Sequence, residues 1–160
     1  MRRFVPLAGA ALLLGVYLLT MAPTLSWSHH GADGGDLVTA VARGSIPHPP
    51  GFPTYLLLGE LFNRLPLRDP AWRLNLLSAV AAGLTIAAVR RLRFPSSTLG
   101  VLCAGLCLGL APLFWSQALI AEVYTVAALF SALVVLLVLA GAPSWAVGLT
   151  FPLGTARWLL

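Results

Sequence analysis

Two carboxylates stand three residues apart in the segment 31–36, which follows the first apolar stretch of the chain. The glycines around Asp33 and Asp36 would let a ligand approach the backbone closely. Beside an apolar surface, one of two neighbouring carboxylates gains a raised pKa and can accept a proton as a general base. A solvated turn is the alternative interpretation, since Asp and Gly are typical turn residues. Asp33 and Asp36 are therefore candidate catalytic residues.

The segment 46–53 holds His48 among four prolines. Proline fixes φ and removes a backbone donor, so this segment cannot be helical and should form a stiff, extended strap. A strap would hold His48 in place, where its ring could donate to a phosphate or transfer a proton. A stiff linker with an incidental histidine is the alternative.

A metal site is a further possibility for the acidic segment. Its carboxylates and the adjoining histidines could together ligate a divalent cation: His29, His30, Asp33 and Asp36. Such a set in one loop fixes no coordination geometry, so we assign no metal ligand and no certain cofactor. Cys103 and Cys107 share an apolar stretch without His or acid, which indicates packing rather than metal or redox chemistry.

Glu122 stands where another apolar stretch begins. A carboxylate at the mouth of an apolar span is costly without a partner or a cavity, which makes Glu122 a functional candidate. The alternative is an interface-level residue favoured by the dipole of the following helix. Trp115 and Tyr124 are typical aromatic-belt anchors. Arg73 and Asn75 open a further apolar stretch, where snorkelling and helix packing are the simpler interpretation.

The composition of the chain requires a membrane. Of its 160 residues, 59% are hydrophobic and only 9% are charged, whereas soluble domains carry roughly 25% charged residues. This excludes an ordinary soluble enzyme, a disordered tail and a disulfide-stapled module. The net charge of +5 comes from arginines. They are scattered or stand at the ends of apolar stretches, which indicates membrane anchoring and no nucleic-acid partner.

The apolar stretches predict the fold class, an all-α polytopic transmembrane helix bundle in one membrane domain, 1–160. A spanning helix needs about 20 apolar residues. The expected spans are about 4–25, 71–89, 98–115 and 121–139, with a possible partial fifth at 144–160. The loop 26–70 cannot span, and its segment 54–65 predicts a short amphipathic helix in the membrane interface.

The arginines also predict an orientation. Arginines at the N-terminus and after the 71–89 stretch crowd the ends of spans, whereas those of the loop 26–70 are spread out, so the N-terminus should lie inside. All five acids then face outward. We therefore expect the loop 26–70 and the turn before 121–139 to meet on the outer side.

Taken in order, several segments resemble a known family. They are Ala22-Pro23-Thr24, Asp33-Gly34-Gly35-Asp36-Leu37, the segment 47–55, Asn75-Leu76-Leu77-Ser78-Ala79, Trp115-Ser116-Gln117 and Ala121-Glu122-Val123-Tyr124. About the first 140 residues resemble the N-terminal region of a bacterial membrane family related to the transmembrane protein O-mannosyltransferase, within the class C glycosyltransferases. The combination is specific, although no single motif is.

The resemblance implies transfer of a sugar from a polyprenyl-phosphate donor to a hydroxyl of a protein or glycan acceptor, at the outer, periplasmic face of a bacterial inner membrane. Asp33 falls at the first acidic position of the family motif and would accept the hydroxyl proton. Asp36 occupies a position that is usually Glu in the family. Glu122 matches an acid on the second outer loop.

The resemblance also implies substrate-binding residues. Donor groups near the lipid phosphate would stabilise the leaving group, and the candidates are Arg73, His48 and, more weakly, Arg43. Tyr55, with Pro49-Pro50, resembles the proline-and-aromatic segment of several class C families. Tyr124 is a further candidate beside Glu122.

Two other interpretations stay open. A small transport or assembly subunit without catalysis is the alternative function, although transport predicts polar groups in mid-span, which the stretches from 71 to 139 almost lack. Family members have more spans, so we interpret the chain as an N-terminal fragment of a larger protein. Further apolar spans downstream in the reading frame would support a fragment, and an immediate stop would favour a subunit.

Overall fold

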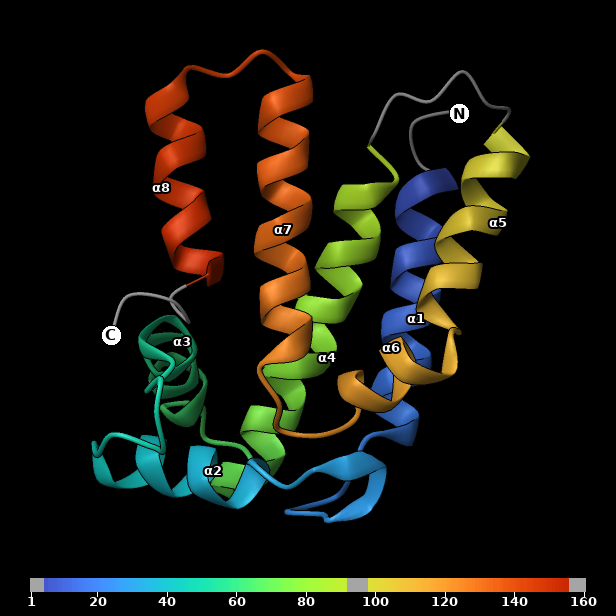
Figure 1. The fold of residues 1–160 in the computed structure, drawn as a ribbon. Coiled ribbons are helices and arrows are strands. Elements are labelled where there is room, and N and C mark those ends of the chain that lie inside the picture. The colour runs from blue at the N-terminus through green and yellow to red at the C-terminus, as the bar shows by residue number, and fades with distance from the viewer. Residues whose placement is uncertain (1–4, 92–97, 156–160) are drawn as a thin grey trace.

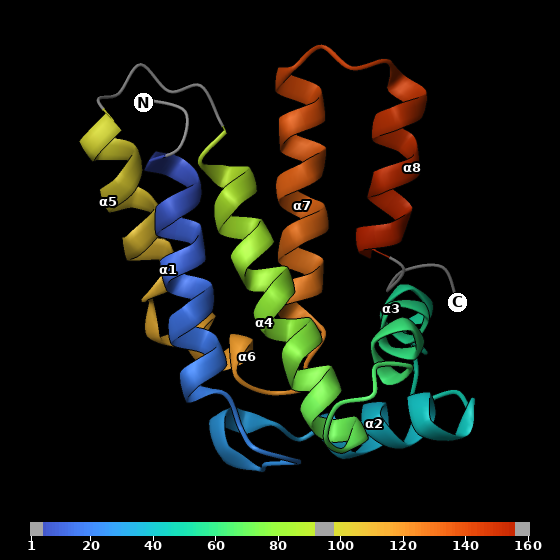
Figure 2. The ribbon, with the colours of Figure 1, turned by 180° about the vertical axis from the view of Figure 1, so that it is seen from behind.

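The apolar stretches of the chain fold into helices, which the computed structural model describes for residues 5–91 and 98–155. Within those residues no strand occurs (Figures 1 and 2). The elements in chain order are α1 (Val5–Thr20), the 3-10 helix η1 (Ser28–His30), α2 (Gly34–Arg43), α3 (Pro53–Asn63), α4 (Pro70–Val89), α5 (Thr98–Gly109), α6 (Pro112–Ala118), α7 (Tyr124–Leu139) and α8 (Ser144–Thr155).

The long helices lie side by side, and the shorter ones gather at one end of the bundle (Figure 1). This end, which we call the site end, is where α1 ends and where α4 and α7 begin. Helix α4 is central, because it packs against α1, α2, α3, α5, α6 and α7. Helix α2 crosses the site end below the others. Residues from distant parts of the sequence therefore meet there.

Helix α4 has clear local signals at its start. Asp69 is the N-cap and accepts a hydrogen bond from the Trp72 N–H at 2.9 Å, and Pro70 occupies the first turn. Both residues favour a helix start, since the cap accepts an otherwise unpaired N–H and proline has none to leave unpaired. The helix then buries residues on both sides, in two apolar cores. One joins α1, α4 and the segment 118–120, and the other joins α2, α3, α4 and the start of α7.

Two polar side chains of α4 are buried between these cores. The Asn75 side-chain amide donates to the carbonyl oxygens of Ala22, at 2.9 Å, and Thr24, at 3.2 Å. The Ser78 hydroxyl donates to the Glu122 carbonyl at 3.2 Å and accepts from the Glu122 N–H at 3.4 Å. A buried backbone group without a partner is costly. These contacts therefore fix the chain after α1 and the connection between α6 and α7 against the same helix.

The expectation of an all-α fold is confirmed, and α4 matches the predicted 71–89 span. Helix α4 is the one helix of the described part that is both long and apolar enough to cross a membrane, or one of two if the bent pair α5–α6 counts as a span. Helices α1 and α7 have 16 residues each, fewer than the about 20 that a span needs. The structure therefore does not by itself establish a polytopic membrane bundle.

Several predicted boundaries were wrong. Helix α1 ends at Thr20 rather than near residue 25, because Pro23 disfavours helical backbone just before it. Helix α7 begins at Tyr124, because the residues before it form the connection bound by Ser78. Helix α8 has 12 residues, and residue 4 and residues 156–160 of the predicted spans lie outside the described residues. The short helix expected at 54–65 is confirmed as α3.

The predicted span 98–115 is a broken element instead of one straight helix. Residues Leu99–Gly109 and Pro112–Ala118 form helices that are bent by 66° from each other. Ala111 has ψ 128°, outside the helical range, as expected for a residue that precedes a proline. The bend turns α6 across the site end and delivers the segment 119–123 to α4.

A close approach at Gly109 gives a test of this packing. A Cβ added there would lie 2.6 Å from Leu13 Cδ1 and 2.9 Å from Ile86 Cδ1. Gly109→Ala should therefore destabilise the fold by about 1–3 kcal/mol through overpacking. Gly15→Ala is the control: a Cβ there meets no described atom within 4 Å, so it should be neutral or stabilising by up to about 1 kcal/mol. Thermal unfolding of the detergent-solubilised protein measures both, and equal midpoints would contradict the helix contact.

Candidate functional site

Helix α2 carries the acidic segment at the site end. Asp33 is its N-cap residue and Asp36 lies in its first turn, where the positive end of the helix dipole favours negative charge. The helix ends at Gly44, whose φ of 64° is left-handed and suits glycine. Two glycines at the start give α2 little intrinsic propensity. Its formation therefore depends on burial of its apolar face, which comprises Leu37, Ala40 and Val41.

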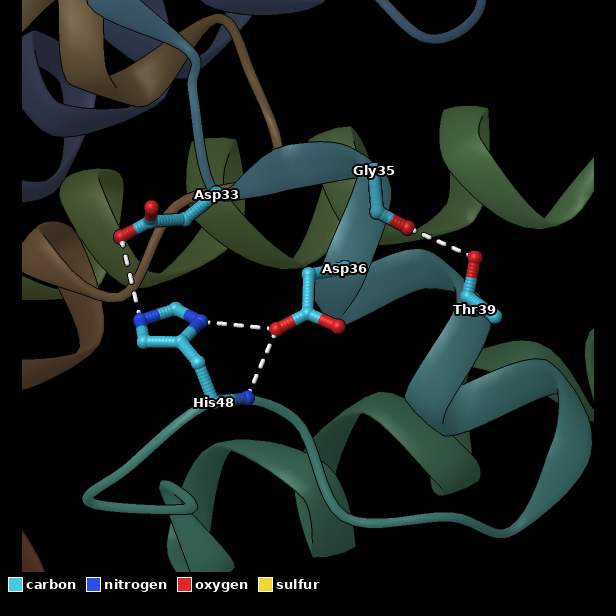
Figure 3. Close-up of polar contacts among 5 residues, drawn as sticks. All are labelled: Asp33, Gly35, Asp36, Thr39 and His48. Carbon is cyan, nitrogen blue, oxygen red and sulfur yellow. Dashed lines mark hydrogen bonds and ion pairs between the residues drawn. The ribbon is translucent and has the colours of Figure 1, made fainter.

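The proline-rich strap brings His48 to both carboxylates (Figure 3). The His48 backbone N–H donates to Asp36 Oδ2 at 2.8 Å, and the His48 Nδ1 lies 2.7 Å from the same oxygen. The other ring nitrogen, Nε2, lies 3.7 Å from Asp33 Oδ2. The imidazole therefore stands between the two acids. The prediction of a non-helical strap is confirmed for residues 46–52, although residues 48–50 form a turn rather than an extended segment and Pro53 is the first residue of α3. The histidine of the strap is the partner of the acidic segment.

This cluster is open to its surroundings. The side chains of His48, Asp33 and Asp36 are 41%, 38% and 45% exposed. The pKa of Asp36 is lowered, first by the hydrogen bond from the His48 backbone N–H and then by the one with its side chain. Asp36 is therefore held as a carboxylate by the strap. Asp33 has no side-chain capping bond among the described residues, so its oxygens can accept a proton from a ligand.

Glu122 lies behind the cluster, in the connection between α6 and α7. Its side chain is 1% exposed. The pKa of Glu122 is raised to about 7, mainly by burial and further by the negative charge of Asp33. The backbone N–H groups of Asp33 and Val123, which face its carboxyl group, partly offset this increase in pKa. The prediction that the loop 26–70 and the turn before α7 meet is confirmed by this contact between Asp33 and Glu122.

Tyr55, on α3, is buried close to Glu122. It is 2% exposed, and its pKa is raised by burial and by the charge of Glu122, with a smaller opposite effect of nearby Ser78. Its hydroxyl makes no hydrogen bond of standard geometry within the described part of the chain. Tyr55 is therefore a buried neighbour of Glu122 rather than a surface group.

The other predicted binding residues lie elsewhere. The guanidinium of Arg73 donates to the connection between α3 and α4, at the carbonyl oxygens of Asn63, Leu67 and Arg68 and at the Asn63 side chain. Arg43 is exposed at the end of α2 opposite to Asp33. Tyr124 is half exposed and lines a pocket of about 390 Å³. The other lining residues are His30, Leu113, Phe114, Gln117 and Thr125.

The possible metal set of His29, His30, Asp33 and Asp36 is not assembled. In residues 5–91 and 98–155, no group of three or more His, Cys, Asp and Glu side chains could hold a metal ion. His29 and His30 are exposed in η1, and the pairing goes to His48 instead. Sequence reasoning also missed Ser78, which binds both backbone groups of Glu122. A lone serine in an apolar helix gives no signal for such a role.

Sequence comparisons show the family to which the chain belongs. A family model described as the protein O-mannosyl-transferase TMEM260 N-terminal domain matches residues 33–145. The chain belongs to this family. The matched region of the TMEM260 N-terminal family begins at Asp33 and includes His48 and Glu122. The resemblance to an O-mannosyltransferase family is therefore confirmed.

Two curated relatives extend the match. The protein O-mannosyl-transferase TMEM260 of Mus musculus is 36% identical over 132 residues, which cover 79% of this chain and 18% of the relative. The protein O-mannosyl-transferase tmem260 of Dictyostelium discoideum is 26% identical over 128 residues, which cover 76% of this chain and 15% of the relative. The chain thus spans less than a fifth of the length of these relatives. No solved structure matches the chain.

The His48–Asp36 contact predicts how the strap of this TMEM260-family chain is held. Asp36→Ala removes the acceptor of the His48 N–H, so amide hydrogen exchange over residues 44–52 should become faster at neutral pH. Thr39→Ala is the control, because it removes only the 2.7 Å bond to the Gly35 carbonyl on the same helix. Unchanged exchange in Asp36→Ala would show that the strap does not depend on Asp36.

The lowered pKa of Asp36 predicts how the Asp36–His48 contact depends on pH. Because the folded pKa of Asp36 lies below its ordinary value of 3.8, the contact stabilises the fold fully above that value and is lost as the pH falls through the lowered pKa. The protection factors of the strap amides in wild type, which correct for the pH dependence of the intrinsic exchange rate, should therefore fall only in strong acid. A loss of protection already as the pH falls from 7 to 5 would contradict the assignment.

Proposed function

We propose that the natural polypeptide containing this chain is a membrane glycosyltransferase of class C type that transfers mannose from a polyprenyl-phosphate donor to a hydroxyl of a protein acceptor. The observation that carries the proposal is the exposed cluster of Asp33, Asp36 and His48 at one end of an apolar bundle. The names of the curated relatives, which are protein O-mannosyl-transferases, supply the reaction class.

Asp33 is the proposed general base. Its carboxylate accepts the proton of the acceptor hydroxyl while that oxygen attacks the anomeric carbon of the sugar. The bond between this carbon and the phosphate oxygen breaks, and the polyprenyl phosphate leaves with the electron pair. Asp36 does not compete for the proton, since its lowered pKa keeps it ionised. A single base is sufficient for an inverting transfer.

His48 is the proposed partner of the leaving phosphate. Its Nδ1 lies 2.7 Å from the Asp36 carboxylate, which fixes the orientation of the ring. In the imidazolium form both ring nitrogens are donors, so the Nδ1–H can donate to Asp36 while the Nε2–H donates to a second acceptor. The imidazole is 41% exposed, so its Nε2 side can approach a phosphate oxygen as well as Asp33. A donor aimed at developing negative charge stabilises the transition state.

The distribution of apolar and basic residues supports a membrane location. Large apolar side chains are exposed along the sides of the bundle, among them Leu12, Leu19, Leu84, Leu99, Val138 and Leu139. Arg90 and Arg91 stand at the end of α4 opposite to the site end. By the positive-inside rule the site end faces outward. We propose a multi-pass protein of a bacterial inner membrane with this site on the periplasmic face.

Replacement of Asp33 tests the function. In the natural polypeptide containing this chain, Asp33→Asn should lower the rate of mannose transfer from polyprenyl-phosphate mannose by about 100-fold or more, as expected for loss of a general base. Glu60→Gln is the matched control, because Glu60 is an exposed acid whose partner is Arg64 on the same helix face; it should keep the wild-type rate.

Two outcomes of the transfer assay would contradict the proposal. Equal transfer rates in Asp33→Asn and wild type would remove Asp33 from the mechanism. Absence of transfer in wild type with every mannosyl, glucosyl and galactosyl polyprenyl-phosphate donor would reject the glycosyltransferase function and favour a non-catalytic subunit.

A further inference from the structure

Glu122 differs from the other acids of the site end in its surroundings. Its side chain is 1% exposed, whereas Asp33 and Asp36 are each more than a third exposed. One carboxyl oxygen, Oε2, is inaccessible and has no hydrogen-bond partner in the described part of the chain. Glu122 therefore cannot reach an incoming hydroxyl without movement of the groups that cover it.

The groups that face Glu122 come from four elements. The backbone N–H groups of Asp33, at the start of α2, and of Val123 face its carboxyl group closely enough to lower its pKa, although neither forms a hydrogen bond of standard geometry with it. Ser78 of α4 binds both backbone groups of Glu122. Tyr55 of α3 and His48 of the strap are the other titratable groups close enough to interact with it, together with Asp33 itself.

These surroundings favour an uncharged carboxyl group. In the described residues, no arginine or histidine forms an ion pair with Glu122; the pairs that occur are His48 with Asp33, His48 with Asp36, and Arg64 with Glu60. The charge of Asp33 repels an ionised Glu122. A buried carboxylate without a paired cation is strongly unfavourable, so such a group keeps its proton.

We propose that Glu122 acts as a positioning residue in its protonated form, whose carboxyl group holds the start of α2 and thereby fixes Asp33 for the transfer reaction. This role rests on the proposed function, and it differs from that of a catalytic base. The carboxyl group faces the Asp33 N–H, which as a donor at the helix start has no partner within the helix. A neutral carboxyl group can fill this place without adding a second negative charge next to the base.

Two substitutions separate this role from a charged one. Glu122→Gln keeps the shape and an oxygen that faces the Asp33 N–H, so it should retain at least a third of the wild-type kcat/KM for mannose transfer at pH 7. Glu122→Ala removes the acceptor and should lose at least tenfold. If Glu122 acts as an ionised base or ligand, Glu122→Gln would lose 100-fold or more while still folding, and that result would overturn the proposal.

The pH profile gives a readout that a merely structural role would not change. With a pKa raised to about 7, wild-type Glu122 ionises above neutral pH, and its charge then repels Asp33 and loosens the start of α2. The wild-type rate should fall above about pH 7, and Glu122→Gln should lack this decline. Identical alkaline profiles in the two proteins would contradict the proposal.

A stability measurement keeps the inference testable if the natural polypeptide transfers no sugar. Because the folded pKa lies above the ordinary value of 4.5, this group stabilises the fold fully below that pH and the contribution is lost as the pH rises to about 7. The melting temperature of wild type relative to Glu122→Gln should therefore fall over that range. If the difference in melting temperature between wild type and Glu122→Gln does not change with pH, the inference is overturned. If that difference falls as expected but no sugar is transferred, only the proposed function is rejected.

Discussion

The site depends on two polar side chains buried on one helix. Asn75 and Ser78 lie one turn apart on α4 and bind backbone groups of the chain after α1 and of the connection before α7. In an apolar bundle these backbone groups have few other partners, so the two side chains select one arrangement of the loops. The start of α2 and Glu122 are thereby placed in contact, although 89 positions separate Asp33 from Glu122 in the sequence.

This arrangement gives three carboxyl groups three different environments. Asp36 is exposed and its pKa is lowered by the strap through His48. Glu122 is enclosed and its pKa is raised by burial. Asp33 lies between them, with a side chain that is partly exposed and a backbone N–H that faces the Glu122 carboxyl group. Neighbouring acids whose pKa values are pushed apart can take different roles, and Asp33 is the one placed to meet a substrate.

The sequence predicts those parts of the fold that depend on local signals. The Asp69-Pro70 start and the long apolar run after it define α4, and the amphipathic pattern defines α3. Helix α2 was not predicted, because its glycine-rich start has low propensity and its stability comes from burial of Leu37 against other helices. The bend at Ala111 was also missed, although Pro112 is a signal for it.

The candidate site was also predicted only where local sequence carries a signal. The acids and His48 stand out by residue type, and the positions of the arginines indicated that the acidic loops share one face. The pairing of His48 with Asp36 depends on the path of the strap, and the binding of Glu122 by Ser78 depends on helix packing. Neither follows from local sequence.

A disulfide between α2 and the connection before α7 tests the assembly of the site most directly. A Cβ on Gly34 would lie 3.9 Å from the Cβ of Ala121, within the range for a disulfide, about 3.5–4.5 Å. In a protein with Cys103→Ser and Cys107→Ser, the pair Gly34→Cys and Ala121→Cys should cross-link rapidly on mild oxidation, and the pair Ala42→Cys and Ala121→Cys should not. Failure of the first pair to cross-link in folded protein, or equal cross-linking of both pairs, would contradict the account.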